Sequence, residues 1–257
     1  MDSAIAPNAW QSSAAYLYIL ELDRIELAWE YLRRNKAYRG QWQDAGDAAP
    51  VTSAKTWHCK RLVDPKIDAR NAFPEWLPNS VSALRVVPAH PEDESLKFSL
   101  WRLPGHKILR RTRSAFLLHG HTARSICRFS LSPRVTHQSA FAYQIPAGLD
   151  PDLATSLIRQ INAAMTAELH SETHASVAIG RPKRESLMHM RTLQALDGAE
   201  AGATHRAIAE SLYGTKDVWR RWSKYSELPS HIRYLLRRGR ALVDGGYFRL
   251  LLVRDSL

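Results

Sequence analysis

Apolar residues recur at three- and four-residue steps close to the N-terminus. Between residues 15 and 38 this spacing predicts one amphipathic helix, with Leu20, Trp29 and Leu32 on its apolar side. Residues 40–83 then contain four prolines among Asp, Asn and Ser. That composition predicts an irregular linker with short extended pieces.

A different pattern begins at residue 84, where short runs rich in β-forming residues are separated by Pro and Gly. The runs occupy residues 84–87, 96–101, 107–110, 114–118, 125–131 and 140–145. They predict a small antiparallel sheet. A helix is expected directly afterwards, because Pro151 suits a first helical position and Leu157, Ile161 and Met165 recur on one face.

The residues after 183 return to helical spacing. Thr204 is expected to cap a short helix over 205–212, and Gly214 is expected to form a tight turn with positive φ. Further helices are expected over 216–225 and over 231–243, the last one capped by Ser230. A short helix, a glycine turn and a basic helix in this order are typical of a helix-turn-helix motif.

These elements predict an α+β protein with three parts. The expected parts are an N-terminal helical module (1–45), a central antiparallel β-rich basic region with a following helix (46–180), and a C-terminal helix-turn-helix domain (181–257).

Positive charge is concentrated in two blocks of a chain whose formal net charge is +11. Residues 97–149 carry nine basic and no acidic side chains, and residues 181–257 carry fifteen basic and eight acidic ones. The rest of the chain is net acidic. Segregation of this kind is expected of a protein that binds a polyanion such as nucleic acid.

The predicted final helix has the clearest chemistry. Ile232, Leu235 and Leu236 begin an apolar stripe that extends to Leu242 and Val243. The arginines fall largely outside it, and guanidinium groups bind phosphate with two hydrogen bonds or read guanine in the major groove. A solvated basic face is the alternative interpretation. The segment 216–225, with Lys216, competes for the groove; we expect 231–243 to enter it and 216–225 to supply phosphate contacts. The expected DNA-binding residues are Arg220, Arg221, Lys224, His231, Arg233, Tyr234, Arg237, Arg238 and Arg240. Of these, Arg237 and Arg238 are expected to anchor the helix.

Several of these runs resemble a known family. Residues 193–197, 205–214 and 233–247 resemble the C-terminal DNA-binding domain of RovC-like bacterial transcription factors, and 28–39 (AWEYLRRNKAYR) resembles the transcriptional regulator-like module that often precedes it. The resemblance implies sequence-specific DNA binding and control of transcription without enzymatic activity. This chain has Lys36 where the family pattern usually has proline, and its longer middle, 50–150, is not explained by the resemblance.

The N-terminal run supports two interpretations. Trp29, Leu32 and Tyr38 either form an aromatic cluster that holds the helix on the body of the protein or contact DNA. The nearby basic residues either bind phosphate or are solvated; they are Arg33, Arg34, Lys36 and Arg39.

Other chemistry has little support in the sequence. His119-Gly120-His121 has the spacing of a metal site, but Gly120 indicates a turn and residues 95–149 contain no carboxylate side chain. Phosphate loops, nucleophile elbows and dinucleotide-binding glycine patterns are missing from the sequence. We therefore predict no enzymatic activity, no cofactor and no metal.

The basic β-rich block leaves two alternatives open. The chain could be an RNA-binding or ribonucleoprotein accessory protein, with Phe98, Trp101, Phe116 or Phe129 stacking on bases, or these aromatics could fill a sheet core. The block could also serve as an effector or oligomerisation module. Preference for duplex DNA over RNA would separate the first alternative from a transcription regulator.

The sequence also predicts the setting in which the protein acts. Its apolar runs are too short to cross a bilayer, its first twenty residues lack the basic start of a signal peptide, and Cys59 and Cys127 have no ligand-like spacing. We expect a cytoplasmic protein that binds double-stranded DNA and no membrane. One helix-turn-helix rarely supplies enough contacts for a specific site, so we also expect a homo-oligomer.

Overall fold

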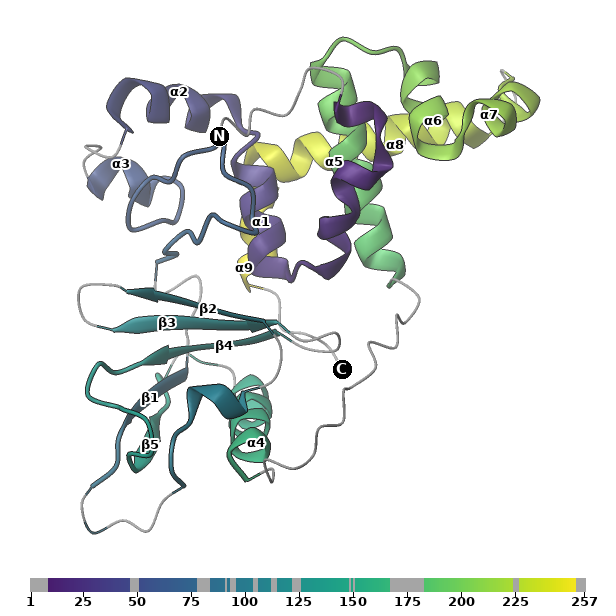
Figure 1. The fold of residues 1–257 in the computed structure, drawn as a ribbon. Helices are drawn as coiled ribbons and strands as arrows, with labels where there is room; N and C mark the ends of the chain where they lie inside the picture. The colour runs from purple at the N-terminus through teal and green to yellow at the C-terminus, as the bar shows by residue number, and fades with distance from the viewer. Residues whose placement is uncertain are drawn as a thin grey trace. The chain divides into compact units, whose positions relative to one another are not determined.

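The computed structural model describes residues 9–46, 51–77, 84–90, 92, 96–103, 106–111, 115–121, 126–147, 149, 151–166, 183–223 and 227–252. The chain folds as two compact units (Figure 1). The first unit joins Met1–Ser80 to Arg181–Leu257, and the second is Val81–Gly180. This division differs from the three consecutive parts expected from the sequence, because the two ends of the chain pack into one body.

Most described residues of the first unit lie in helices. Its 3-10 helices are η1 (Ala9–Gln11) and η2 (Ser13–Glu21), and η5 (Leu242–Gly246) is a kinked turn in which Asp244 and Gly245 leave helical backbone angles. Its α-helices are α1 (Arg24–Leu32), α2 (Lys36–Ala45), α3 (Val51–Lys55), α5 (Arg184–Glu200), α6 (His205–Tyr213), α7 (Thr215–Arg221), α8 (Glu227–Ala241) and α9 (Phe248–Leu252).

The prediction of one helix over 15–38 is wrong, because two capping residues divide it. Asp23 follows η2 and caps α1: its carboxylate accepts a hydrogen bond from the Glu26 amide, and the Glu26 carboxylate accepts one from the Asp23 amide. Asn35 caps α2 by accepting from the Tyr38 amide. Lys36 thus occupies the first position of α2, where the proline of the family pattern would also fit.

The described part of the segment predicted as an irregular linker, residues 40–46 and 51–77, is helical at its start and irregular after α3, where it packs against α1 and α2. It contains most of α2 and all of α3, and Cys59 pairs with Trp76 in an isolated β-bridge. The Tyr38 hydroxyl donates to the Val63 carbonyl and accepts from the Val63 amide, both at 2.8 Å. Trp29 and Tyr38 are fully buried, with their rings edge to face at 5.7 Å. The aromatic-cluster interpretation of this region is therefore confirmed.

The second unit is built on a five-stranded sheet. Its elements are β1 (Leu84–Pro88), η4 (Leu100–Arg102), β2 (His106–Arg111), β3 (Phe116–His121), β4 (Ile126–Leu131), β5 (Phe141–Gln144) and α4 (Pro151–Thr166). The strand order is β2-β3-β4-β1-β5. The prediction of an antiparallel sheet is wrong at one pairing: β1 runs parallel to β4, with Leu84 opposite Phe129. Sequence pattern alone does not distinguish these directions, because both ladders alternate side chains in the same way.

The core of this unit lies between the sheet and α4, which covers one face of it (Figure 1). The helix begins at Pro151 as predicted, and Leu157, Ile161 and Met165 are buried. Phe98 and Phe129 are buried as well, and Phe116 packs against the same core. Only Trp101 of the four aromatics considered for base stacking is exposed, at 76%.

Gly120 lies inside β3, opposite Lys107 and Cys127, so the turn expected at this glycine is wrong. The strand continues through it because β3 is paired with a neighbouring strand on each side. Across the described ranges, no three His, Cys, Asp or Glu side chains gather as a metal site would require. No described helix is long and apolar enough to cross a membrane.

Candidate nucleic-acid interface

The α6–α7 hairpin is formed by two residues that the sequence identifies. The Thr204 hydroxyl accepts a hydrogen bond from the Ala207 amide and caps α6. Gly214 ends the helix at φ +88° and leads directly into α7. A side chain at this φ is strained, so glycine makes the sharp turn possible. The predictions of the cap, of the short helix and of positive φ at Gly214 are confirmed.

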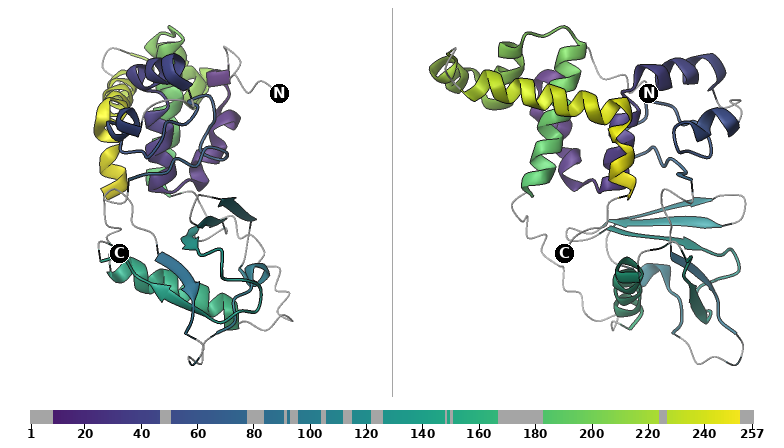
Figure 2. Two further views of the ribbon diagram at one scale, coloured as in Figure 1. Left: turned by 90° about the vertical axis from the view of Figure 1, so that its left-hand side faces the viewer. Right: turned by 180° about the vertical axis from the view of Figure 1, so that it is seen from behind.

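A hydrophobic core fixes α5, α6, α7 and α8 relative to one another. Its buried members are Trp10, Ala195, Ile208, Ala209, Val218, Ile232, Leu235 and Leu236. Helix α8 crosses α5 (Figure 2), and Gly239 makes the approach possible, since a Cβ on it would lie 2.7 Å from the Leu196 side chain. Of the predicted apolar stripe, Leu242 and Val243 are only half-buried, because they lie in the kinked turn beyond α8.

Helix α7 is held by one buried side chain, Val218, and is otherwise exposed. Lys216, Arg220 and Arg221 are solvent-exposed, and Trp219 is 74% exposed. The helix ends at Arg221, four residues before its predicted end, and Lys224 lies outside the described residues.

Helix α8 begins at Glu227 rather than after Ser230. Pro229 therefore lies in the first turn, where its missing N–H removes no helical hydrogen bond. Ser230 lies inside the helix, and its hydroxyl accepts a hydrogen bond from Arg233. Beyond this turn Arg233, Arg237 and Arg240 are all exposed. Steps of four and three residues place them in one row along the helix.

Arg238 departs from the predicted basic face. Its side chain is half-buried, and its Nε is shielded from solvent without a hydrogen-bond partner among the described residues. The Arg238 charge acts on two buried side chains. It lowers the pKa of His189, which desolvation already lowers. It also lowers the pKa of Tyr31, although burial raises that pKa overall. The guanidinium therefore lies near α1 and α5. The structure thus separates Arg238 from Arg237, its neighbour in the expected anchor.

Tyr234 lies next to the arginine row, and His231 lies beyond it, toward Tyr213. The His231 ring stacks on Tyr234 with centroids 6.2 Å apart, and it lies 6.1 Å from the Tyr213 ring. Desolvation and the nearby Arg191 charge lower the pKa of His231. The imidazole is therefore neutral at pH 7 and can accept or donate a hydrogen bond there.

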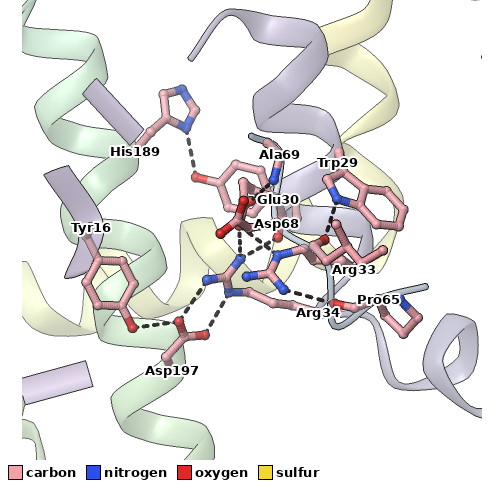
Figure 3. Close-up of polar contacts among 12 residues, drawn as sticks. Tyr16, Trp29, Glu30, Arg33, Arg34, Pro65, Asp68, Ala69, His189 and Asp197 are labelled. Atoms are coloured by element: carbon pink, nitrogen blue, oxygen red, sulfur yellow. Dashed lines mark hydrogen bonds and ion pairs between the residues drawn. The ribbon is translucent and has the colours of Figure 1, made fainter. Parts of the chain in front are cut away.

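A buried charge network on α1 reaches Asp197 of α5 (Figure 3). The fully buried Glu30 carboxylate accepts from Arg33 at 2.8 Å and from Arg34 at 2.6 Å. It also accepts from the Ala69 amide at 2.7 Å. Burial alone would raise the pKa of Glu30, but the two guanidinium groups outweigh it and lower the pKa to about 2.

Asp197 connects this network to α5. Its carboxylate accepts two hydrogen bonds from Arg34 and a third from the Tyr16 hydroxyl at 2.7 Å. Burial raises the pKa of Asp197, and the Arg34 charge reverses that effect and lowers it. Arg33 and Arg34 are both 6% exposed. They are therefore neither solvated nor available to contact phosphate. The other two basic residues of this run differ: Arg39 forms an ion pair with Glu200, and Lys36 is exposed.

A second buried contact joins the same two helices. The Tyr31 hydroxyl lies 2.7 Å from Nδ1 of His189, which is 1% exposed. Desolvation and the Arg238 charge lower the pKa of His189 to about 4, despite Glu185 near its other nitrogen. The imidazole is therefore neutral at pH 7.

The sequence carries a signal for part of this network that charge counting overlooks. Glu30, Arg33 and Arg34 have i, i+3 and i, i+4 spacing, which places opposite charges side by side on a helix. Their partner Asp197 has no such signal, since it is 163 positions away from Arg34. Arg191 of α5 lies over the Tyr213 ring of α6, with the guanidinium 5.3 Å from the ring centroid.

Two family models match the chain. One describes the DNA-binding domain of the T6SS transcription factor RovC and matches residues 145–252. The other describes a proteobacterial transcriptional regulator-like domain and matches residues 9–61. Comparison with curated proteins gave no significant match. The first match includes all of α5 to α8, and the second includes the Glu30, Arg33 and Arg34 side chains of the buried network.

Proposed function

We propose that this chain, which matches the RovC DNA-binding domain behind a proteobacterial regulator-like domain, is a sequence-specific regulator of transcription. It acts on double-stranded DNA in the bacterial cytoplasm and catalyses no reaction. The observation that carries the proposal is the exposed arginine row on α8, above a core shared with the α6–α7 hairpin.

The α6–Gly214–α7 hairpin serves as the helix-turn-helix. The row formed by Arg233, Arg237 and Arg240 enters the major groove, where guanidinium groups read guanine edges. Exposed Lys216, Arg220 and Arg221 on α7 contact phosphates and fix the register. His231 and Tyr234 extend the α8 surface, and Arg238 contributes from its half-buried position.

The protein binds as a homo-oligomer. One such surface contacts only a short base sequence, and a second copy doubles the contacts available for a specific site. Size-exclusion chromatography with light scattering, with and without DNA, tests this part independently. A mass of one chain in both conditions would refute it.

The experiment that tests the function is fluorescence anisotropy of the purified protein with duplex DNA from upstream of its own gene. Unlabelled single-stranded DNA, RNA and scrambled duplex serve as competitors, at two salt concentrations. We expect tight duplex binding that survives scrambled competitor, with a salt slope that counts the phosphate contacts. Loss of binding to any competitor duplex, or preference for RNA, would reject the proposal.

The roles of α7 and α8 can be separated in the same assay. Substituting Arg237 with Ala should reduce affinity for the specific duplex more than for the scrambled one, because base contacts carry specificity. Substituting Arg220 with Ala should weaken both duplexes alike and flatten the salt slope. The reverse pattern would place α7 in the groove instead.

A further inference from the structure

A pocket lies between α5, α6, α7 and the first turn of α8. It has a volume of about 410 Å³ and is lined by Arg191, Tyr213, Arg221, Glu227, Leu228 and His231. Each of these residues comes from one of four helices joined by the same core, so the pocket is built by the fold rather than by one loop. It lies at the start of α8, the helix that bears the exposed arginine row.

Two guanidinium groups line this pocket without a carboxylate partner in the described part of the chain. Arg191 is half-buried over the Tyr213 ring, and Arg221 is exposed at the end of α7. Neither forms an ion pair with Glu227, although its carboxylate also lines the space. Unpaired arginines at a concave surface favour an anion, and planar guanidinium groups suit phosphate oxygens best.

The Tyr213 ring fixes the position of one of these arginines. Its centroid lies 5.3 Å from the Arg191 guanidinium. An aromatic face attracts a cation at this distance, so the ring holds Arg191 at the pocket.

We infer that this pocket binds a phosphate group, held by the guanidinium groups of Arg191 and Arg221. The occupant is a phosphodiester of the bound DNA, because Arg221 belongs to α7, whose exposed basic residues contact phosphates in the proposed function. The assignment of the phosphate to DNA rests on the proposed function. The ability of the pocket to bind a phosphate group does not.

The test measures how the DNA affinity depends on salt in wild-type protein and in variants. Arg191→Ala should flatten the slope of log K against log [salt] by about 0.9, equally for specific and scrambled duplex. Arg221→Ala should have the same effect. Because both side chains hold one phosphate, the double variant should lose no more slope than either single variant. Lys66→Ala removes an exposed charge elsewhere in the same unit and should leave the slope unchanged.

A second measurement distinguishes the source of the phosphate. The melting temperature is compared in inorganic phosphate and in chloride of equal ionic strength, for wild type and Arg191→Ala. Stabilisation of wild type alone, with DNA slopes unaffected by the substitution, supports the pocket and assigns it to a free phosphate compound. Circular dichroism of each variant verifies that the helices remain formed.

Two results would overturn the inference. In the first, the wild type binds DNA, and Arg191→Ala changes neither the salt dependence of DNA affinity nor the effect of phosphate on the melting temperature. The other is an additive loss of slope in the double variant, which would place the arginines on separate phosphates. If wild type binds no duplex at all, the proposed function fails, and the phosphate measurement alone decides about the pocket.

Discussion

Arg34 and Asp197 form a two-bond ion pair that joins the segment matched by the regulator-like model to helix α5. Arg34 Nε lies 2.7 Å from one carboxylate oxygen of Asp197, and its Nη2 lies 2.8 Å from the other. The buried network contains two positive and two negative charges. Glu30 pairs with both Arg33 and Arg34, and Asp197 pairs with Arg34. The regulator-like segment and helices α5 to α8 therefore share one folding unit.

Removing the Asp197 charge should destabilise the whole first unit. Asp197→Asn leaves two buried guanidinium groups with only the Glu30 carboxylate, and breaking a buried pair costs about 3–5 kcal/mol. Urea denaturation gives the free energy of unfolding. The matched control is Glu200→Gln on the same helix, which removes an exposed pair with Arg39 and should cost less than about 1 kcal/mol. Equal losses in the two variants would contradict this account of the network.

Stability should fall as the pH is lowered from about 6.5 to about 4. Burial keeps the pKa of His189 at about 4, below its ordinary value of 6.5, so in this range the unfolded chain binds a proton that the folded chain does not. Protonation thus favours the unfolded state. His189→Gln should flatten the pH dependence of the unfolding free energy across this window. An unchanged slope in that variant would show that other groups cause it.

The Arg238 charge should widen the same pH window. Desolvation lowers the pKa of His189 most, and the Arg238 charge lowers it next. Arg238→Met should therefore raise the pKa of His189 in the folded protein. The pH range over which stability falls should then end at a higher pH. Arg237→Met is the matched control, because Arg237 is exposed and neutralising it should leave the pKa of His189 unchanged. Titration of the His189 ring protons by nuclear magnetic resonance measures both variants. Identical titration curves would remove Arg238 from the vicinity of His189.

Arg237 should affect DNA binding without affecting stability. Its side chain is exposed in the described structure, and loss of one base-reading guanidinium costs about 1–3 kcal/mol of discrimination. Arg237→Ala should therefore weaken specific binding by about 5- to 150-fold in anisotropy. The melting temperature should not change. Full affinity in this variant would exclude Arg237 from the interface.

Two glycines should respond in opposite directions to alanine. A Cβ on Gly239 would lie 2.7 Å from Leu196, so Gly239→Ala forces α5 and α8 apart and should cost about 1–3 kcal/mol. Gly40, inside α2, has open space around it, and Gly40→Ala should stabilise the protein by about 0.5–1 kcal/mol. Thermal unfolding of both variants checks the pair. A stable Gly239→Ala protein would show that Leu196 moves without cost.

Local features of helices α5 to α8 could be predicted from the sequence alone. Thr204, Gly214 and the buried spacing of Ile232, Leu235 and Leu236 follow from hydrogen-bonding and backbone preferences that act within a few residues. The family resemblance could be identified in the same way, because it rests on runs of consecutive residues. The exposed row on α8 also follows from its spacing.

The positions of the charged side chains, in contrast, depend on the tertiary fold. In the sequence, Arg33 and Arg34 look like exposed basic residues. In the structure both are buried, and Arg34 pairs with Asp197 of α5. Arg238 and Arg237 are adjacent, but α8 turns one toward His189 and leaves the other in solvent. Burial depends on which helix covers a position. Asp197 is 163 positions from Arg34, and His189 is 49 positions from Arg238, so no local pattern contains either contact.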